Sequence, residues 1–123
     1  MLKFLSLSSG SSGNCYFLTD GVSGLLIDAG VSPRRVRKEL GAYGLGFNDF
    51  QAILVTHDHL DHIRYLGAFC KRFQKPVYAT PLLHEAMLRH SFTRDFITPC
   101  RRVFSEGANH LSDGIELRYF VVP

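Results

Sequence analysis

The stretch His57-Asp58-His59-Leu60-Asp61-His62 places three histidines and two aspartates within six consecutive residues. It directly follows Ala52-Ile53-Leu54-Val55, a continuous apolar run that predicts a strand buried on both faces. Apolar residues then recur at helical spacing from Ile63 to Phe73, so we expect a helix to start at or just after His62. The stretch is therefore a strand-to-helix turn that supplies four candidate metal ligands: His57, His59, Asp61 and His62.

These side chains fit two metal ions better than one. His57 and His59 are separated by one residue and can reach the same cation from a tight turn, whereas Asp61 and His62 leave the backbone in another direction and can reach a second cation. Two metals roughly 3.5–4 Å apart can activate a water molecule and stabilise both attacking and leaving oxygens. Imidazole and carboxylate without thiolate favour Zn²⁺, with Mn²⁺ or Fe as alternatives. Asp58 either orients a ligand histidine or caps the turn.

The rest of the chain alternates predicted strands and helices, which indicates an α/β (α+β) fold with a mixed sheet and flanking helices. Strands are expected at 2–7, 14–19, 24–28, 52–56, 76–79 and 115–122. Helices are expected from Ser32-Pro33 to between Gly41 and Gly46, over 63–73, and from Pro81 to about His90.

Composition limits the class of protein. At 123 residues and 46% hydrophobic content, the chain fits one globular domain or part of one. The net charge of +3 permits an anionic substrate without requiring one, because basic clusters are more often solvated helix faces. Three widely spaced cysteines match neither a disulfide framework nor a zinc pattern, and no stretch approaches about 20 apolar residues. We expect a cytoplasmic protein that does not enter a membrane.

Several residues outside the histidine-rich stretch could be mistaken for functional ones. The segment Ser8 to Gly13 lacks the lysine of a phosphate-binding loop and is followed by a strand, so a strand-to-strand turn is favoured. His84 and His90 are expected on the surface rather than as ligands, since a histidine near a helix C-terminus is favourable by itself. Cys15 and Cys70 lie in apolar patterns and are expected in the core.

Several segments of the sequence resemble those of a known protein family. The sequence THDHLDH, Thr56 to His62, resembles the His-x-His-x-Asp-His signature of the metallo-β-lactamase superfamily, and Asp28 in GLLIDAG resembles its first conserved aspartate. The segments SLSSGSSGNCYFL, LLIDAGVSPRRV and AILVTHDHLDHIRYLG are similar to its YycJ/WalJ-like branch, whose members are associated with DNA metabolism as exonuclease-type phosphodiesterases. The likeness covers most of residues 1–123.

The resemblance implies an αββα sandwich with two divalent metals, zinc first, at the rim of one sheet. It makes His57 and His59 ligands of the first metal, and Asp61 and His62 ligands of the second. Asp61 would also help to orient the attacking water and so act in catalysis. Asp28 would be a structural acidic residue, or one that hydrogen-bonds a ligand from outside the coordination sphere.

The family's remaining ligands are a third histidine on the first metal, an aspartate that bridges both and a last histidine on the second. They lie in motifs that this chain lacks, and the family's domain is roughly twice this length. We therefore expect residues 1–123 to be the N-terminal portion of a single metallo-β-lactamase-like domain. Metal binding should be weak or absent and turnover negligible in this chain alone, and an uncovered apolar sheet face should favour self-association.

The leading functional interpretation is a metal-dependent hydrolase that cleaves phosphodiester bonds in DNA with a metal-bound hydroxide. One alternative is a hydrolase of the same superfamily that acts on a thioester, a lactone or a β-lactam. Another is a fold fragment or interaction module without catalysis.

Overall fold

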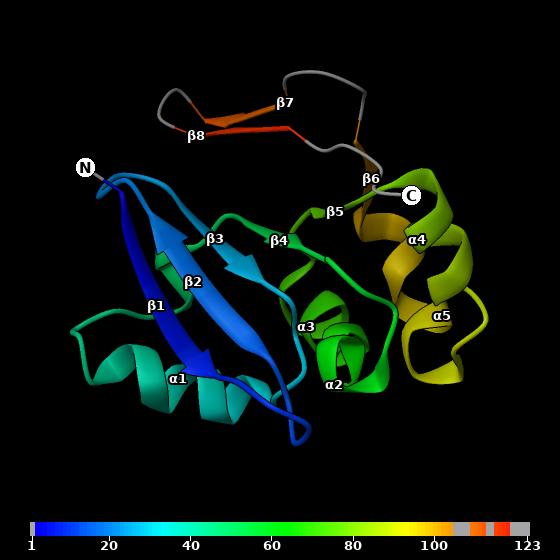
Figure 1. Ribbon diagram of the computed structural model, residues 1–123, viewed down its shortest axis with the longest axis horizontal. Helices are drawn as coiled ribbons and strands as arrows, with labels where there is room; N and C mark the ends of the chain where they lie inside the picture. Colours follow the sequence, from blue (N-terminus) through cyan, green and yellow to red (C-terminus); the bar gives the residue numbers. More distant parts are fainter. Residues whose placement is uncertain (1, 105–108, 113–114, 119–123) are drawn as a thin grey trace.

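The described residues of this computed structural model, 2–104, 109–112 and 115–118, form a six-stranded sheet, a separate two-stranded sheet and flanking helices (Figure 1). The strands are β1 (Lys3–Ser8), β2 (Cys15–Thr19), β3 (Gly24–Ile27), β4 (Ala52–Leu54), β5 (Val77–Ala79), β6 (Arg101–Val103), β7 (Asn109–Ser112) and β8 (Ile115–Leu117). The helices are α1 (Pro33–Gly41), α2 (Leu60–Ile63), α3 (Leu66–Phe73), α4 (Pro81–Met87) and α5 (Ser91–Ile97), with short 3₁₀ turns η1 (Phe47–Asp49) and η2 (Thr98–Cys100). The predicted mixed sheet with flanking helices is confirmed.

Connection lengths determine the strand directions of the larger sheet, whose order follows the chain from β1 to β6. Short polar turns join β1 to β2 and β2 to β3, and these pairs are antiparallel. Helical crossovers join β3 to β4, β4 to β5 and β5 to β6, and these pairs are parallel. The carboxyl ends of β3 and β4 therefore lie side by side, which brings the residues after each strand together.

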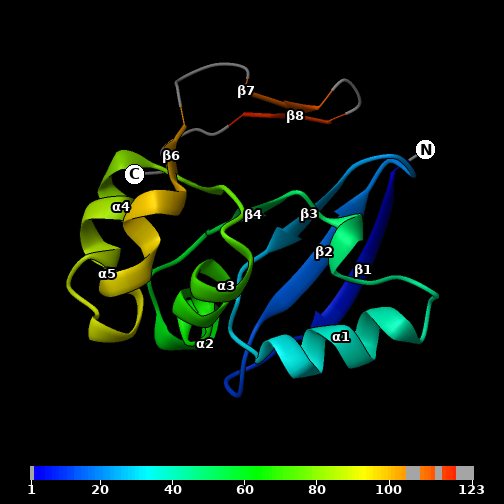
Figure 2. The same cartoon turned by 180° about the vertical axis from the view of Figure 1, so that it is seen from behind.

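The core lies between one face of this sheet and the helices. Alternate strand residues, such as Phe17, Leu26 and Ile53, point toward helix residues such as Val36 and Phe69, and all five are at most 1% exposed. Figure 2 shows α1 and α3 on this face of the sheet. Successive strand side chains point to opposite faces, so the other face carries the alternate residues.

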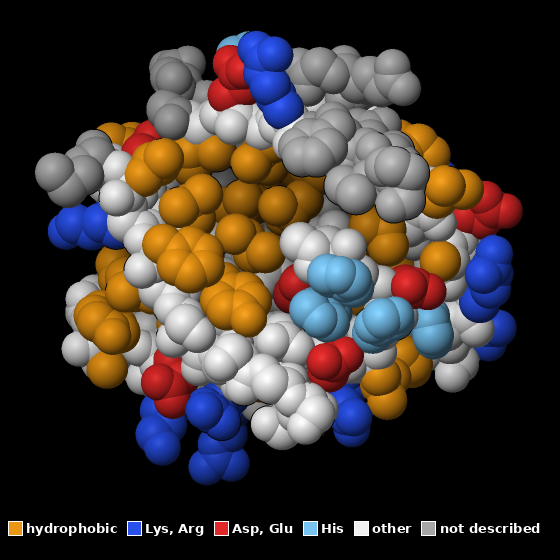
Figure 3. Space-filling model, viewed as in Figure 1, with side chains coloured by type: hydrophobic (Ala, Val, Ile, Leu, Met, Phe, Trp, Pro, Cys, Tyr) orange, Lys and Arg blue, Asp and Glu red, His pale blue; other side chains and the backbone are white. Residues whose placement is uncertain are grey.

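That other face is apolar and partly uncovered. Phe4, which is 58% exposed, stacks on Tyr16 with ring centroids 5.6 Å apart, and Leu18 is paired with Phe4 across the strands. Figure 3 shows this apolar surface as a hollowed patch directly beside the histidines. The β7–β8 hairpin lies at the end of the molecule opposite α1 and α2 (Figures 1 and 2).

The helix after the histidine-rich stretch begins earlier than predicted. It starts at Leu60, with Asp61 in its first turn, where a negative charge favours the helix. It breaks after Ile63, because the Tyr65 N–H donates a hydrogen bond to the Ala29 carbonyl 2.9 Å away, and α3 then follows. Tertiary contact with the loop after β3 therefore divides one predicted helix into two.

The C-terminal part differs most from the sequence prediction. The helix that begins at Pro81 ends at Met87 rather than near His90, and α5, β6 and β7 were not predicted. The predicted strand at 115–122 is observed at Ile115–Leu117, and residues 119–122 lie outside the described residues. Short elements such as the three-residue β6 have too few residues for a periodic pattern to mark them.

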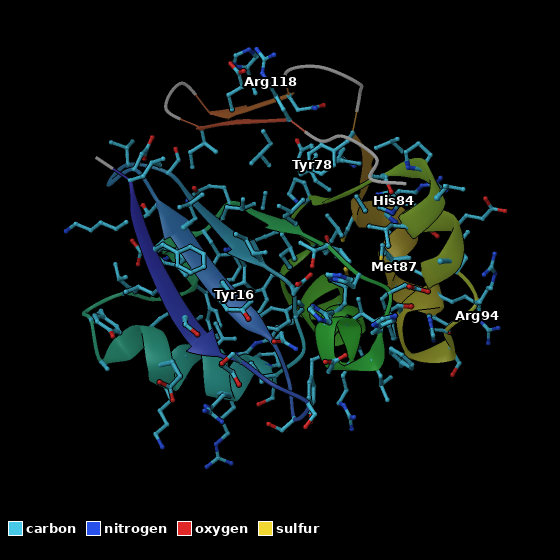
Figure 4. All side chains as sticks on the ribbon, in the orientation of Figure 1. Tyr16, Tyr78, His84, Met87, Arg94 and Arg118 are labelled. Atoms are coloured by element: carbon cyan, nitrogen blue, oxygen red, sulfur yellow. The ribbon has the colours of Figure 1, made fainter. Side chains whose placement is uncertain are left out.

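Cys15 and Cys70 lie in the core as predicted, and burial raises the pKa of both thiols, which disfavours the reactive thiolate. The surface prediction for His84 is wrong, because its side chain is 1% exposed. Its Nε2 lies 2.5 Å from the Arg102 carbonyl oxygen and donates to it, which ties α4 to β6. His84 and Met87 lie about one turn apart, and both are on the buried side of α4 (Figure 4).

Burial lowers the pKa of His84 below its ordinary value of 6.5, because the protonated ring loses hydration. Below that pH the unfolded chain binds a proton that the folded chain does not, so stability falls as the pH falls. We expect His84→Gln to reduce the slope of the free energy of unfolding between about pH 7 and about pH 5, by at most about 1.4 kcal/mol per pH unit. Urea denaturation at several pH values measures this slope, and an unchanged slope would contradict the interpretation.

Gly67 lies where α3 passes α5, and a Cβ there would stand 1.9 Å from the Phe92 carbonyl oxygen. Gly41, at the end of α1, would place a Cβ in open space. We expect Gly67→Ala to lower the free energy of unfolding by about 1–3 kcal/mol through overpacking. Gly41→Ala should leave it unchanged or raise it by up to about 1 kcal/mol. Equal stabilities of the two variants in urea denaturation would refute the close packing of α3 on α5.

Candidate metal centre

The predicted ligands gather at the carboxyl ends of β3 and β4. Asp28 directly follows β3, the turn with His57 and His59 follows β4, and α2 carries Asp61 and His62. Crevices at the carboxyl ends of parallel strands are common ligand sites in α/β proteins. Figure 3 shows the histidines in one surface patch with acidic side chains around them.

Asp28 is the buried centre of this arrangement, at 1% exposure and with a left-handed backbone φ of 62°. Its Oδ1 accepts the Thr56 N–H at 2.8 Å. Its Oδ2 accepts the Thr56 hydroxyl at 2.5 Å and the His62 Nδ1–H at 2.7 Å. A buried carboxylate needs such donors, so Asp28 is satisfied by the protein itself and is suited to orient other side chains.

These hydrogen bonds determine which ring nitrogens can bind a metal. Because His62 Nδ1 donates to Asp28, its Nε2 keeps a free lone pair. The Thr56 hydroxyl donates its single proton to Asp28, so its oxygen accepts from His57 Nδ1, 2.9 Å away. His57 Nε2 therefore also keeps its lone pair, and one carboxylate sets both tautomers.

The side chains lie close enough to share ions. The ring centroids of His57 and His62 are 4.6 Å apart, those of His57 and His59 5.7 Å, and those of His59 and His62 6.5 Å. Asp61 Oδ2 lies 3.9 Å from His62 Nε2, whereas two ligand atoms on one tetrahedral zinc lie about 3.3 Å apart. Small side-chain movements would bring Asp61 and His62 onto one ion.

The most compact group of possible ligand atoms among the described residues comprises Asp28, His57 and His62, within 4.8 Å of one another. Asp28 already accepts three hydrogen bonds, whereas the two imidazoles each present a free nitrogen. The donor set of imidazoles and carboxylates therefore fits a divalent metal such as zinc. The Asp58 side chain makes no hydrogen bond with another described residue, so neither of its two predicted roles has a partner there.

The sequence interpretation missed two residues of this centre. Thr56 connects Asp28 to His57 by hydrogen bonds. The sequence feature that could have indicated this role is its position as a polar residue between a buried strand and the histidines. Asn14 is 8% exposed, and its Nδ2 lies 3.1 Å from Asp61 Oδ2. The signal for Asn14 was weaker, since it lies 47 residues from Asp61 in the sequence.

A polar pocket of about 230 Å³ adjoins the loops that form the centre. It is lined by Ser12, Gly30, Val31, Ser32, Arg35, Arg64 and Tyr65. Arg64 and Tyr65 directly follow α2, and Gly30 packs against the Asp61 backbone. Two guanidinium groups line the pocket, and Arg35 Nε is already paired with Glu39 Oε1 at 3.0 Å. Arg64 therefore contributes most of the positive charge with which this pocket could attract an anionic group.

Comparison with known proteins adds independent findings. Residues 9–117 match the sequence profile of the Metallo-beta-lactamase superfamily. The chain is 30% identical over 120 residues to the "Exodeoxyribonuclease WalJ" of Streptococcus pneumoniae, and 35% identical over 121 residues to the "Exodeoxyribonuclease YycJ" of Bacillus anthracis. Each alignment covers 98% of this chain and 45% of the relative, so the chain spans less than half of their length.

Among solved structures, Zn²⁺-bound PqqB from Methylobacterium extorquens superimposes with a TM-score of 0.71 and 19% identity. That match covers 100% of this chain and 56% of PqqB, and it shows likeness of fold alone. Within the described residues, no helix combines the length and apolar character needed to span a membrane.

We expect Asp28→Asn in the full-length protein to weaken metal binding by about 10–100-fold, because an amide cannot accept from all three donors. Competition with a chromophoric chelator measures the affinity. Asp58→Asn is the matched control and should have a smaller effect, since its carboxylate contacts no described histidine. If Asp58→Asn weakened metal binding as much as Asp28→Asn, the orienting role would belong to Asp58. An unchanged metal affinity for Asp28→Asn would refute the orienting role of Asp28.

Proposed function

We propose, for a chain that belongs to the metallo-beta-lactamase superfamily, that the complete protein is a metal-dependent hydrolase that cleaves phosphodiester bonds in DNA as an exonuclease. The observation that carries the hydrolase proposal is the hydrogen-bonded chain from Asp28 to His57 and His62, which presents two free imidazole nitrogens at one surface. Two relatives named exodeoxyribonucleases, 30% and 35% identical, support DNA as the substrate.

In this proposal two divalent metals bind in the complete protein, one at His57 and His59 and the other at Asp61 and His62. Zinc is the first choice, with Mn²⁺ or Fe as alternatives, because the donors are imidazole and carboxylate without thiolate. Once bound, such metals would lower the pKa of water to about 7 and would stabilise negative charge on the phosphodiester.

The protein's own groups divide the remaining tasks. Asp28 and Thr56 hold His57 and His62 in the tautomers that leave Nε2 free. Asp61, which is partly exposed beside His62, would accept a hydrogen bond from the attacking water and so orient it. In this proposal Arg64, in the neighbouring polar pocket, would contact a phosphate of the substrate backbone.

We further propose that residues 1–123 are the N-terminal portion of one domain, and that further ligands lie elsewhere in the complete protein. The basis is the 45% coverage of the two exodeoxyribonuclease relatives. Metal binding and turnover by this chain alone should then be weak, because affinity depends on ligand number. Its exposed apolar face, around Phe4 and Tyr16, should favour self-association when uncovered. A cytoplasmic location stays a prediction of the sequence.

We expect the metal-loaded full-length protein to release mononucleotides from one end of single-stranded or duplex DNA labelled at its 5′ or 3′ end. His57→Ala should reduce the rate by about 100-fold or more, because it removes a metal ligand. His110→Ala is the matched control, since this exposed histidine lies on β7 outside the centre, and its rate should not change.

The same protein should be offered a thioester, a lactone and a β-lactam. Intact DNA with hydrolysis of any of these would replace the nuclease proposal by another activity of the superfamily. Tight metal binding without hydrolysis of any substrate would favour a non-catalytic interaction module.

A further inference from the structure

The Ser8–Gly13 turn ends at Asn14, a buried residue that joins this turn to two segments of the candidate metal centre, the loop after β3 and helix α2. The Asn14 backbone N–H donates to the Asp61 carbonyl oxygen at 2.7 Å. The Asn14 carbonyl oxygen accepts a hydrogen bond of 3.0 Å from the N–H of Gly30, which lies two residues after Asp28. The turn before β2, the loop after β3 and helix α2 therefore meet at this one backbone position.

The orientation of the Asn14 side-chain amide is forced by its neighbours. Asn14 Oδ1 accepts from the Gly10 N–H and from the Tyr16 hydroxyl, both at 3.1 Å. Its Nδ2 donates to the Gly10 carbonyl oxygen at 3.0 Å. If the amide were flipped, its NH₂ group would face the Gly10 N–H and its oxygen would face the Gly10 carbonyl oxygen. Nδ2 must therefore point toward Asp61. There it donates to Asp61 Oδ2 at 3.1 Å.

Glycine is required for the backbones to come this close. A Cβ on Gly30 would stand 1.9 Å from the Asp61 carbonyl oxygen. A Cβ on Gly13, whose φ is +149°, would stand 2.6 Å from the Gly30 carbonyl oxygen. The Ser8 hydroxyl closes the turn with a hydrogen bond to the Gly13 carbonyl at 2.9 Å. The strand-to-strand turn predicted for Ser8 to Gly13 is therefore closely packed.

We propose that Asn14 is a positioning residue whose amide fixes the rotation of the Asp61 carboxylate for metal binding. The inference rests on the role of Asp61 as a ligand in the proposed function. Without the amide, the partly exposed Asp61 side chain would have to be ordered when the metal binds, and that entropy cost would reduce affinity. Asn14 holds Oδ2 at 3.9 Å from His62 Nε2, so both groups face the same ion before it arrives.

The test is a Co²⁺ titration of the full-length protein, in which visible absorption reports both affinity and ligand geometry. Asn14→Asp keeps the shape of the side chain but replaces the donor with a carboxylate that repels Asp61. Asn14→Ala removes the donor without adding charge. Both should weaken Co²⁺ binding by about 10–100-fold and change the absorption spectrum of the bound ion.

Two matched variants serve as controls. Tyr16→Phe removes one of two donors to Asn14 Oδ1 but leaves the Gly10 contacts and the Asp61 contact, so it should weaken Co²⁺ binding far less than either Asn14 variant. Ser11→Ala changes an exposed residue of the same turn and should also have no effect. Thermal unfolding with excess chelator measures the stability of each metal-free variant.

The outcomes separate the two proposals. If Asn14→Asp and Asn14→Ala lower only the unfolding midpoint while the folded protein binds Co²⁺ with unchanged affinity and spectrum, Asn14 is merely structural and the inference is wrong. If the unchanged protein binds no Co²⁺, the metal-dependent function itself fails and the inference fails with it.

Discussion

The candidate metal centre depends on a single buried carboxylate. Asp28 lies between the ends of two parallel strands, accepts two hydrogen bonds from Thr56 and one from His62, and is almost completely shielded from water. Electrostatic interactions are stronger in such an environment, so these donors are held firmly, and an unpaired Asp28 would be costly. The position of each free imidazole nitrogen follows from this arrangement.

Two backbone constraints make the arrangement possible. The parallel pairing of β3 and β4 brings Asp28 and Thr56 side by side, and the Asp28 N–H itself continues the ladder by donating to the Leu54 carbonyl at 2.7 Å. The close approach of Gly30 to the Asp61 backbone then sets α2 against the loop after β3. The candidate metal centre therefore lies on short connecting segments that are anchored at the ends of β3 and β4 and at α2.

Much of the fold could be predicted because its elements carry strong local signals. The first three strands, α1 with its Ser32 cap, and β4 all lie close to their predicted positions. The predictions failed where tertiary contacts override local patterns. The Tyr65 hydrogen bond to Ala29 divides one apolar periodic segment into α2 and α3. His84 is buried because β6 packs beside α4 and its Arg102 carbonyl accepts a hydrogen bond from the His84 ring. No sequence pattern predicted that strand.

By itself, the sequence predicted the four candidate ligands from His57 to His62 and the class of fold, since these depend on residue types and on spacing along the chain. The family resemblance, rather than the spacing, singled out Asp28. Only the tertiary structure decided which nitrogen His57 and His62 each present and which residues hold the ligands in place. Thr56 acts by its position between Asp28 and His57, and Asn14 reaches Asp61 across 47 residues of sequence. Hydrogen-bond geometry between distant segments exists only after folding, so the sequence pattern alone carries no direct record of it.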